Sequence, residues 1–427
     1  MTMKTFNALA ALLAASTLQK QGVNASNFRF RKFNVTNTAR RSTVTGITFP
    51  LSLREADILR EPGATRSISV VRDEEVCAPP PYRVDLDLCI DDLKKKGLYP
   101  VTHPEDEAFW EQFEVVVEAQ RYIKMKQEDP CIPDPLPKVM PYLTQYWKGF
   151  DILEVAEAVH DEFPGKWHYA MLEEWVGKGE VVYDDKVVPK FGNYDFLRRQ
   201  VMLSDMVGYA FRSSGPCNFS LKWREGRARP EEVAFAIFEK TLNTPRGIDL
   251  SAIAQAIRNM DLKDPTDFTA YAEGSPTHPS WPAMHSASSA SSFWLDVILI
   301  LTPEQRCTAR MLDWSVSYAR TVAGVHYPDD NLAGLTVGQG ILAQILPDYL
   351  ERNYNADKHI VKKKIEKAMF DWNEFVDSDC YKEQRFKAVP AAEPEQCLLP
   401  PTGSKGGKSS KSDKSSKLDK SGVTAEL

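Results

Sequence analysis

Apolar residues recur at helical spacing along most of the chain from Glu105 onward, and this period most constrains the fold. The first such stretch has six apolar side chains, each three or four residues from another of the set: Phe109, Phe113, Val116, Val117, Ala119 and Tyr122. This spacing places them on one face of an α-helix. Strand-like alternation is almost absent over the same region. The sequence therefore predicts an all-α fold, made of one helical bundle or two.

The helical pattern predicts a domain over residues 105–400. After the first helix comes a proline-rich connector, about 130–141, and further helices are expected at about 149–162, 166–176, 194–213, 231–242, 249–260, 286–301, 303–323, 329–346 and 357–376. Residues 26–104 show no sustained helical period. We expect them to form an extended N-terminal arm packed on the helical domain.

The first 25 residues have the pattern of a secretory signal peptide, with the alternatives of a buried helix or a transit peptide. A short positive start is followed by the apolar stretch 6–18, and Ala25 offers a small residue for cleavage. Sequons at Asn24, Asn34 and Asn218 fit export. The chain is therefore predicted to be secreted and extracellular, with cell-wall association suggested by its C-terminus.

The chain has seven cysteines, without the CxxC or Cys/His spacing of a zinc site. In an exported protein they could form up to three disulfides. After the signal, the best apolar run is the nine-residue stretch 293–301, which contains Asp296. A membrane span needs roughly 20 apolar residues, so no transmembrane segment is predicted. A formal net charge of −6 argues against nucleic acid as the main partner.

Residues 401–427 differ in kind from the helical domain, because they are rich in Lys and Ser and almost free of large apolar side chains. Such a segment cannot bury enough surface to fold, so we predict a disordered tail. Its lysines follow a strict spacing of three: Lys405, Lys408, Lys411, Lys414, Lys417 and Lys420. This repeat resembles the lysine clusters of silaffins and other silica-associated proteins. The resemblance implies silica or another polyanion as its partner; the alternative is a solvated tail that aids solubility.

Three short segments hold the candidate site. The first places Lys222, Arg224, Arg227 and Arg229 within eight positions, and Pro230 suits the first position of a helix. Arg229 would then lie at a helix N-terminus, where backbone N–H groups favour an anion. A solvated basic loop is the alternative interpretation.

The second segment runs from His278 through Trp281 and Pro282 to His285, which precedes the helix expected at 286–301. Prolines stiffen the approach to this helix. A histidine at a helix N-terminus has its charged form disfavoured, so nearby anions would be needed to restore its basicity. The alternative is a structural histidine at a helix end.

The third segment contains Arg320, His326 and Asp330. A spacing of four between His326 and Asp330 would bring a carboxylate to an imidazole N–H within one helical turn. That contact fixes the tautomer and leaves the other ring nitrogen as a ligand or nucleophile. Arg320 adds a planar, permanently charged donor. A surface cluster is the alternative.

In this order, Lys222-x6-Arg229-Pro, Pro282-x-x-His285 and Arg320-x5-His326-x3-Asp330 resemble the phosphatidic-acid-phosphatase type 2 superfamily. This superfamily joins acid phosphatases, lipid phosphatases and vanadium-dependent haloperoxidases on an α-helical fold. The resemblance implies that Lys222, Arg229 and Arg320 neutralise the oxygens of phosphate or vanadate. His326 would bind vanadium or attack phosphorus, Asp330 would orient His326, and His285 would act as general acid and base.

Several features favour the haloperoxidase branch. A lipid phosphatase is disfavoured by the lack of predicted membrane spans. The stretch His278-Pro-Ser-Trp281-Pro resembles the His-Pro-Ser-Tyr-Pro of algal vanadium bromoperoxidases. His278 and Trp281 are therefore expected to tune halide preference towards bromide or iodide. The resemblance implies vanadate as cofactor, hydrogen peroxide and halide as substrates, and organic halogen acceptors; homologous haloperoxidases are often oligomers, which leaves a homo-oligomer open.

One departure from the family pattern stands beside His285. The family usually has Ser-Gly there, whereas this chain has Ala283-Met284. Ala283 lacks the hydroxyl that would donate to the oxyanion, while the backbone N–H of Met284 can still donate. Losing one such bond costs roughly 1–3 kcal/mol, which favours the easily oxidised iodide. The alternatives are a soluble acid phosphatase on the same site, and a non-catalytic silica- or wall-associated protein with a decayed pocket.

Overall fold

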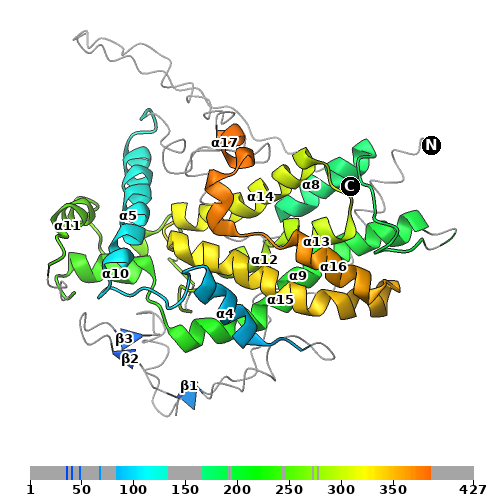
Figure 1. The fold of residues 1–427 in the computed structure, drawn as a ribbon. Helices are drawn as coiled ribbons and strands as arrows, with labels where there is room; N and C mark the ends of the chain where they lie inside the picture. The colour runs from blue at the N-terminus through cyan, green and yellow to red at the C-terminus, as the bar shows by residue number, and fades with distance from the viewer. Residues whose placement is uncertain are drawn as a thin grey trace, which may run out of the picture. The chain divides into compact units, whose positions relative to one another are not determined.

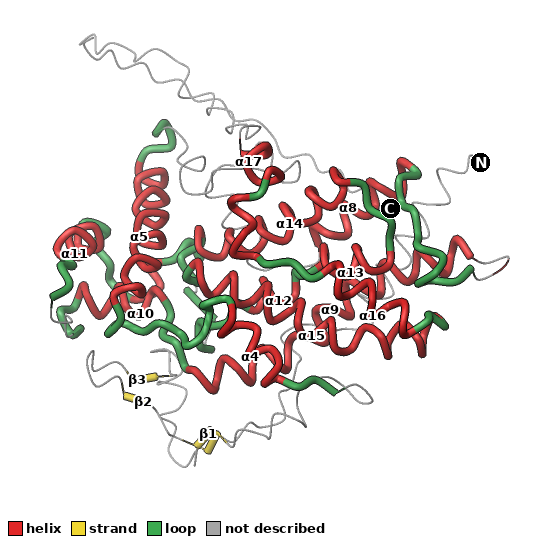
Figure 2. Tube along the Cα trace, in the orientation of Figure 1, coloured by secondary structure: helices red, strands yellow, loops and turns green. Residues whose placement is uncertain are grey.

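The computed structural model describes residues 83–132, 166–190, 195–242, 247–271 and 278–385, together with Gly192, residues 274–276 and four two-residue strands. The predicted signal peptide at 1–25, the tail at 401–427 and the helix expected at 149–162 lie outside these described residues. The described part is mostly helical, as Figure 2 shows, so the prediction of an all-α fold is confirmed.

The helices in chain order are α4 (Leu86–Lys95), α5 (Glu107–Glu128), α8 (Lys166–Lys178), α9 (Asp195–Glu225), α10 (Pro230–Phe238), α11 (Ser251–Arg258), η3 (Pro265–Phe268), α12 (Met284–Ser288), α13 (Ser291–Ile298), α14 (Pro303–Val322), α15 (Pro328–Tyr354), α16 (Lys358–Ala368), η4 (Trp372–Asp377) and α17 (Asp379–Arg385). The strands are β1 (Val35–Thr36), β2 (Arg40–Arg41), β3 (Thr48–Phe49) and β4 (Ser67–Ile68). β1 pairs with β4 and β2 with β3, both antiparallel.

Helices α9, α12 and α15 pack against one another at the centre of the main core, with α4, α13, α14 and α16 around them (Figure 1). Two glycines of α15 allow the short helix α12 to lie close. A Cβ atom on Gly334 would lie 2.4 Å from the carbonyl oxygen of Ala283, and one on Gly338 would lie 2.1 Å from that of Ala287. Both distances are below any normal contact, so this packing requires glycine.

A second, smaller apolar cluster joins α5, α10 and α11, which Figure 1 shows together. Phe109 and Phe113 of α5 pack there on the ring of Tyr327, at the start of α15. The apolar period that predicts α5 from the sequence thus supplies the contact face of this cluster. The two clusters meet near Tyr327, and the candidate site lies there.

One disulfide joins Cys307 in α14 to Cys380 in α17 across 73 residues, and Cys131 is also disulfide-bonded. Cys89 and Cys217 are buried thiols. With two thiols among seven cysteines, at most two disulfides can form, not three.

Several predicted helix boundaries are wrong. Helix α4 lies inside the arm predicted at 26–104, and α9 continues to Glu225 past Pro216. A proline inside a helix removes one backbone hydrogen bond and costs about 3 kcal/mol, which the buried faces of a 31-residue helix offset. The single helix expected at 286–301 is two helices, because Asp313 accepts the N–H groups of Ser291 and Ser292 and so caps a new start.

Among the described residues, no helix is both long and apolar enough to cross a membrane. The described residues likewise contain no group of three or more His, Cys, Asp or Glu side chains arranged to hold a metal cation.

Candidate functional site

The last turns of α9 hold the segment that leads to His285. Lys222 is fully buried, and its ammonium donates to the carbonyl oxygens of Pro279 (2.9 Å) and Ser280 (2.8 Å). One turn earlier, the Nδ2 atom of Asn218 donates to the carbonyl of Pro282 at 3.0 Å. The segment between these two contacts is therefore fixed along one face of α9.

Asn218 is completely buried, and its amide is bonded to the backbone. The sequon at Asn218 is therefore closed to a glycan in the folded protein, and this part of the sequence argument for export is wrong. The side chain instead belongs to the wall of the candidate site.

Arg229 joins the chain segments of the site. It is the N-cap residue of α10, which begins at Pro230 as the sequence predicts, and its own N–H donates to Glu232 Oε2 at 2.8 Å. Its guanidinium donates to the carbonyls of His278 (2.9 Å) and Val325 (2.7 Å). It also reaches one ring nitrogen of each of two histidines, at 3.0 Å: Nδ1 of His278 and Nε2 of His326.

His326 and Asp330 meet, although not on a helical turn. The ring of His326 precedes α15, whose N-cap residue is Tyr327. Asp330 lies in the first turn, and its Oδ2 accepts from the Tyr327 N–H at 3.0 Å and from His326 Nδ1 at 3.1 Å. Because a carboxylate only accepts, the imidazole proton is placed on Nδ1 and the Nε2 lone pair faces Arg229.

Arg320 comes from the last turn of α14 and is buried, with Nη1 donating to the hydroxyl of Tyr271 at 2.7 Å. The chain then turns through Gly324, whose φ of +82° favours glycine. A Cβ there would lie 2.7 Å from Cδ of Gln120, which donates to the Val322 carbonyl at 2.6 Å. Gln120 in α5 therefore supports the turn that leads to His326.

Burial and like charge lower the pKa values of the site's cations. Burial, then the charge of Arg229, lowers the pKa of Lys222 well below its usual value. Burial and Arg320 lower the pKa of Arg229 to about 10, and burial lowers the pKa of Arg320. Burial and the charges of Arg229 and Lys222 lower the pKa of His326 well below its usual range. These groups form one field that an anion would relieve.

The second sequence segment lies against this field. His285 is half-buried in the first turn of α12 and acts electrostatically on His326. His278 is bonded to Arg229, lies edge-on to Phe219, and has a pKa lowered by burial and by Lys222. The structure thus brings both histidines to the field around His326.

The other predicted site residues have different positions. Ala283 is the N-cap residue of α12, and its N–H donates to the Asp330 carbonyl at 2.9 Å. Met284 lies over α9, where its Cε would be 3.2 Å from a Cβ on Gly215. Trp281 is buried in the main core, with its ring 6.0 Å from that of Tyr99. The halide-tuning role expected of Trp281 stays a prediction.

Two polar groups that bind Asp330 were not predicted from the sequence. The hydroxyl of Ser280 donates to Oδ2, and Arg227 donates to Oδ1 at 2.7 Å. Both residues stand inside the motif segments, but their spacing gave no signal that they reach a residue so far along the chain.

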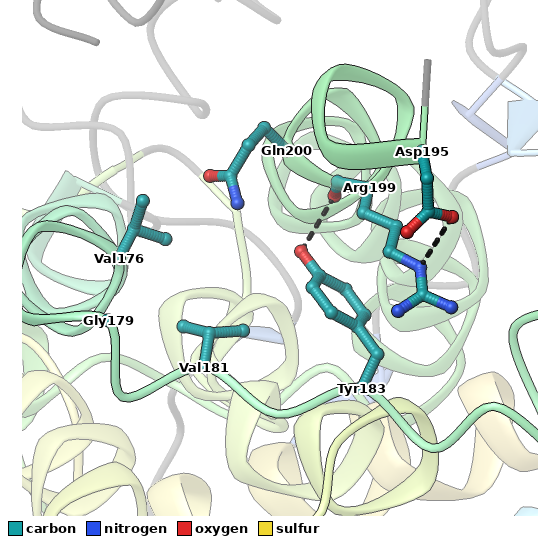
Figure 3. A pocket seen from close by; sticks show the side chains of 7 residues that line it. All are labelled: Val176, Gly179, Val181, Tyr183, Asp195, Arg199 and Gln200. Carbon is teal, nitrogen blue, oxygen red and sulfur yellow. Dashed lines mark hydrogen bonds and ion pairs between the residues drawn. The ribbon is translucent and has the colours of Figure 1, made fainter. Parts of the chain in front are cut away.

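A separate pocket of about 220 Å³ lies between α8, the segment after it and the start of α9 (Figure 3). Its arginine, Arg199, is paired with Asp195 at 3.1 Å and with Asp185 at 2.7 Å. Tyr183 donates to the Arg199 carbonyl at 3.0 Å, and none of the predicted site residues lines this pocket. The arginine of this pocket is therefore already paired with carboxylates.

A search of curated proteins found no match to this chain. A comparison with protein-family models matched residues 206–354 to the PAP2 superfamily. The match spans all three motif segments, from Lys222 to Asp330, and the helices that position them. The part of the chain that is similar to the PAP2 superfamily, residues 206–354, is thus the part in which buried cations surround His326.

Proposed function

We propose that the chain is a secreted vanadium-dependent haloperoxidase that oxidises iodide or bromide with hydrogen peroxide. The observation that supports this most is the gathering of three buried cations, Lys222, Arg229 and Arg320, whose pKa values burial lowers. Asp330, which attracts both Lys222 and Arg229, is itself bonded to Arg227, and Glu231 and Glu232 also attract Arg229. Burying several cations close together is costly, so the donor set fits a bound oxyanion.

The residues fit vanadate as well as phosphate. Lys222, Arg229 and Arg320 would hold its oxygens, and the Nε2 lone pair of His326 would face its vanadium. Hydrogen bonding to Asp330 keeps the His326 proton on Nδ1, so Nε2 remains a donor of electrons. Bound vanadate would supply a Lewis acid that activates hydrogen peroxide without changing its own oxidation state.

His285 is the group proposed to move protons, because it lies at the field and is half-exposed. The overall reaction consumes one proton: hydrogen peroxide, halide and a proton give hypohalous acid and water. His285 would deliver that proton to the departing oxygen. The hypohalous acid formed would then halogenate organic acceptors.

The haloperoxidase is preferred over an acid phosphatase because of His278. Because its pKa is lowered, the His278 ring is uncharged at neutral pH. A hydrogen bond nevertheless holds it against Arg229. It belongs to the stretch that resembles algal bromoperoxidases. Ala283 removes one hydroxyl from the site, which supports iodide as the preferred halide.

The proposal also covers where the protein is located. We place it outside the cell, in keeping with the predicted signal peptide and with the Cys307–Cys380 disulfide. The lysine-rich tail is proposed to bind silica or another polyanion and so to locate the enzyme at a wall.

The test is a comparison of two activities on the purified full chain. With vanadate present, we expect hydrogen peroxide and iodide to give triiodide, and added phosphate to compete. Hydrolysis of p-nitrophenyl phosphate without halide turnover would instead make the chain an acid phosphatase. A ligand present at 100 times its Kd adds about 2.7 kcal/mol to the free energy of unfolding. If neither phosphate nor vanadate stabilises the fold, the decayed-site alternative is supported.

A further inference from the structure

Arg227 differs from the other cations near the site, because acidic groups already surround it. Its Nη1 atom lies 2.7 Å from Asp329 Oδ1 and 2.7 Å from Asp330 Oδ1. Its Nη2 atom donates to Thr102 Oγ1 at 2.8 Å. The guanidinium also lies 4.2 Å over the ring of Tyr327. Arg227 is fully buried, and none of these contacts is with solvent.

The electrostatics separate Arg227 from the anion-binding cations. Although burial opposes it, the charges of Asp329 and Asp330 raise the pKa of Arg227, whereas the pKa values of Lys222 and Arg229 are lowered. A guanidinium already bonded to two carboxylates has little charge left for an oxyanion. Its action on the site must therefore pass through Asp330.

Arg227 binds one carboxylate oxygen of Asp330 and leaves the other to different donors. Oδ1 is held by Arg227, and Oδ2 is left to accept from the Tyr327 N–H, from Ser280 and from His326 Nδ1. With Oδ1 fixed, the carboxylate cannot rotate to offer both oxygens elsewhere. The acceptor that sets the His326 tautomer is thus held in place on the Nδ1 side of the ring.

The contacts of Arg227 extend beyond the matched domain of 206–354. Thr102 precedes α5, and Gln112 of α5 accepts the N–H of Asp329 at 3.1 Å. The ring of Phe109, also in α5, lies 5.5 Å from the guanidinium. One wall around Arg227 therefore comes from residues 102–112.

We infer that Arg227 is a positioning residue, which, with Thr102, holds Asp330 so that His326 keeps its proton on Nδ1 and presents Nε2 to a bound oxyanion. The oxyanion part rests on the proposed function; the tautomer part does not. The matched domain then lacks a complete site without the segment before it.

The first experiment reads the tautomer in the ligand-free full chain at one fixed pH. Only seven histidines are present, so ¹⁵N-histidine spectra are simple, and a His326→Gln variant assigns the signal of interest. We expect the Nδ1–H form of His326 in the unchanged protein and a mixture of both forms in Arg227→Gln. The control is Arg224→Gln, a change at an exposed arginine of the same segment.

The second experiment measures the affinity for inorganic phosphate by calorimetry. Loss of a group that orients a ligand from outside typically costs 10- to 100-fold in affinity. We expect roughly that loss in Arg227→Gln, a smaller loss in Thr102→Val, and partial recovery in Arg227→Lys, which keeps the charge. The last two variants also serve if Arg227→Gln does not fold.

An unchanged tautomer and affinity in Arg227→Gln, matching Arg224→Gln, would overturn the inference. If Arg227→Gln does not fold, an unchanged tautomer in Thr102→Val together with an unchanged phosphate affinity in Arg227→Lys would overturn it as well. If the unchanged protein binds neither phosphate nor vanadate, the proposed function fails, and the tautomer comparison still decides the role of Arg227.

Discussion

The Nε2 atom of His326 lies 3.0 Å from Nη1 of Arg229, and its Nδ1 atom lies 3.1 Å from Asp330. The ring is therefore held at both nitrogens, by an acceptor on one side and a cationic donor on the other. An oxyanion bound at this place would meet the lone pair and the cation together.

Replacing His326 with Ala should abolish vanadate-dependent iodide oxidation, because it removes the Nε2 lone pair that is proposed to bind vanadium. Replacing His285 with Ala should lower the rate by roughly 10²- to 10⁴-fold, the usual contribution of a general acid. Initial rates of triiodide formation measure both. His359→Ala, at an exposed histidine of α16, is the control, and equal losses in all three would speak against the assignment.

Ala283→Ser should tighten vanadate binding by roughly fivefold, because one added hydrogen bond contributes about 1 kcal/mol. The position is the N-cap of α12, where serine is well tolerated. Titration of vanadate against the intrinsic fluorescence of the protein measures the change. Ala283→Gly adds no hydroxyl, and an equal gain in that variant would show that the effect is not due to the added bond.

The helices that were predicted correctly from the sequence are those whose extent depends on residues close along the chain. Helix α5 follows its apolar period, and α10 begins at Pro230, because periodicity and capping are local properties. The sequence did not predict the break between α12 and α13, which depends on a carboxylate of Asp313 from another helix. Long-range caps of this kind leave no local pattern.

The same division applies to the site. Motif spacing indicated which residues would gather at His326, but it placed the His326–Asp330 contact on a helical turn, whereas the structure forms it at a helix start. The bond from Arg227 to Asp330 joins residues 103 positions apart, so no spacing rule could predict it. Thr102 lies further away still and outside the motif region.

Gly338→Ala should destabilise the protein and lower its activity, because the added Cβ would lie 2.1 Å from the carbonyl oxygen of Ala287 in the helix that bears His285. Overpacking of this kind typically costs 1–3 kcal/mol. Gly340→Ala is a matched control on the same helix, where the nearest atom, Cys89 Sγ, is 3.3 Å away. Urea unfolding measures the difference, and equal stability of the two variants would contradict the packing argument.

Removing the Cys307–Cys380 disulfide by changing both residues to Ser should lower the free energy of unfolding by about 4 kcal/mol, the chain-entropy value for a loop of this length. Neither sulfur lies in the candidate site, so turnover of the folded enzyme at low temperature should be unchanged. Urea titration with and without reductant tests this. A variant as stable as the unchanged protein would show that the bond constrains little.

Phosphate affinity should fall as the pH rises through the lowered pKa of Lys222, below its usual 10.5, because the amine attracts an anion only while it is protonated. Lys222→Met should bind phosphate weakly at every pH and should lack this decline. What remains near pH 10 then belongs to Arg320 and to Arg229, whose pKa is lowered to about 10. Calorimetric titrations at several pH values give both curves. If the two proteins lose affinity over the same pH range, Lys222 is not the titrating group, and the positive field has another source.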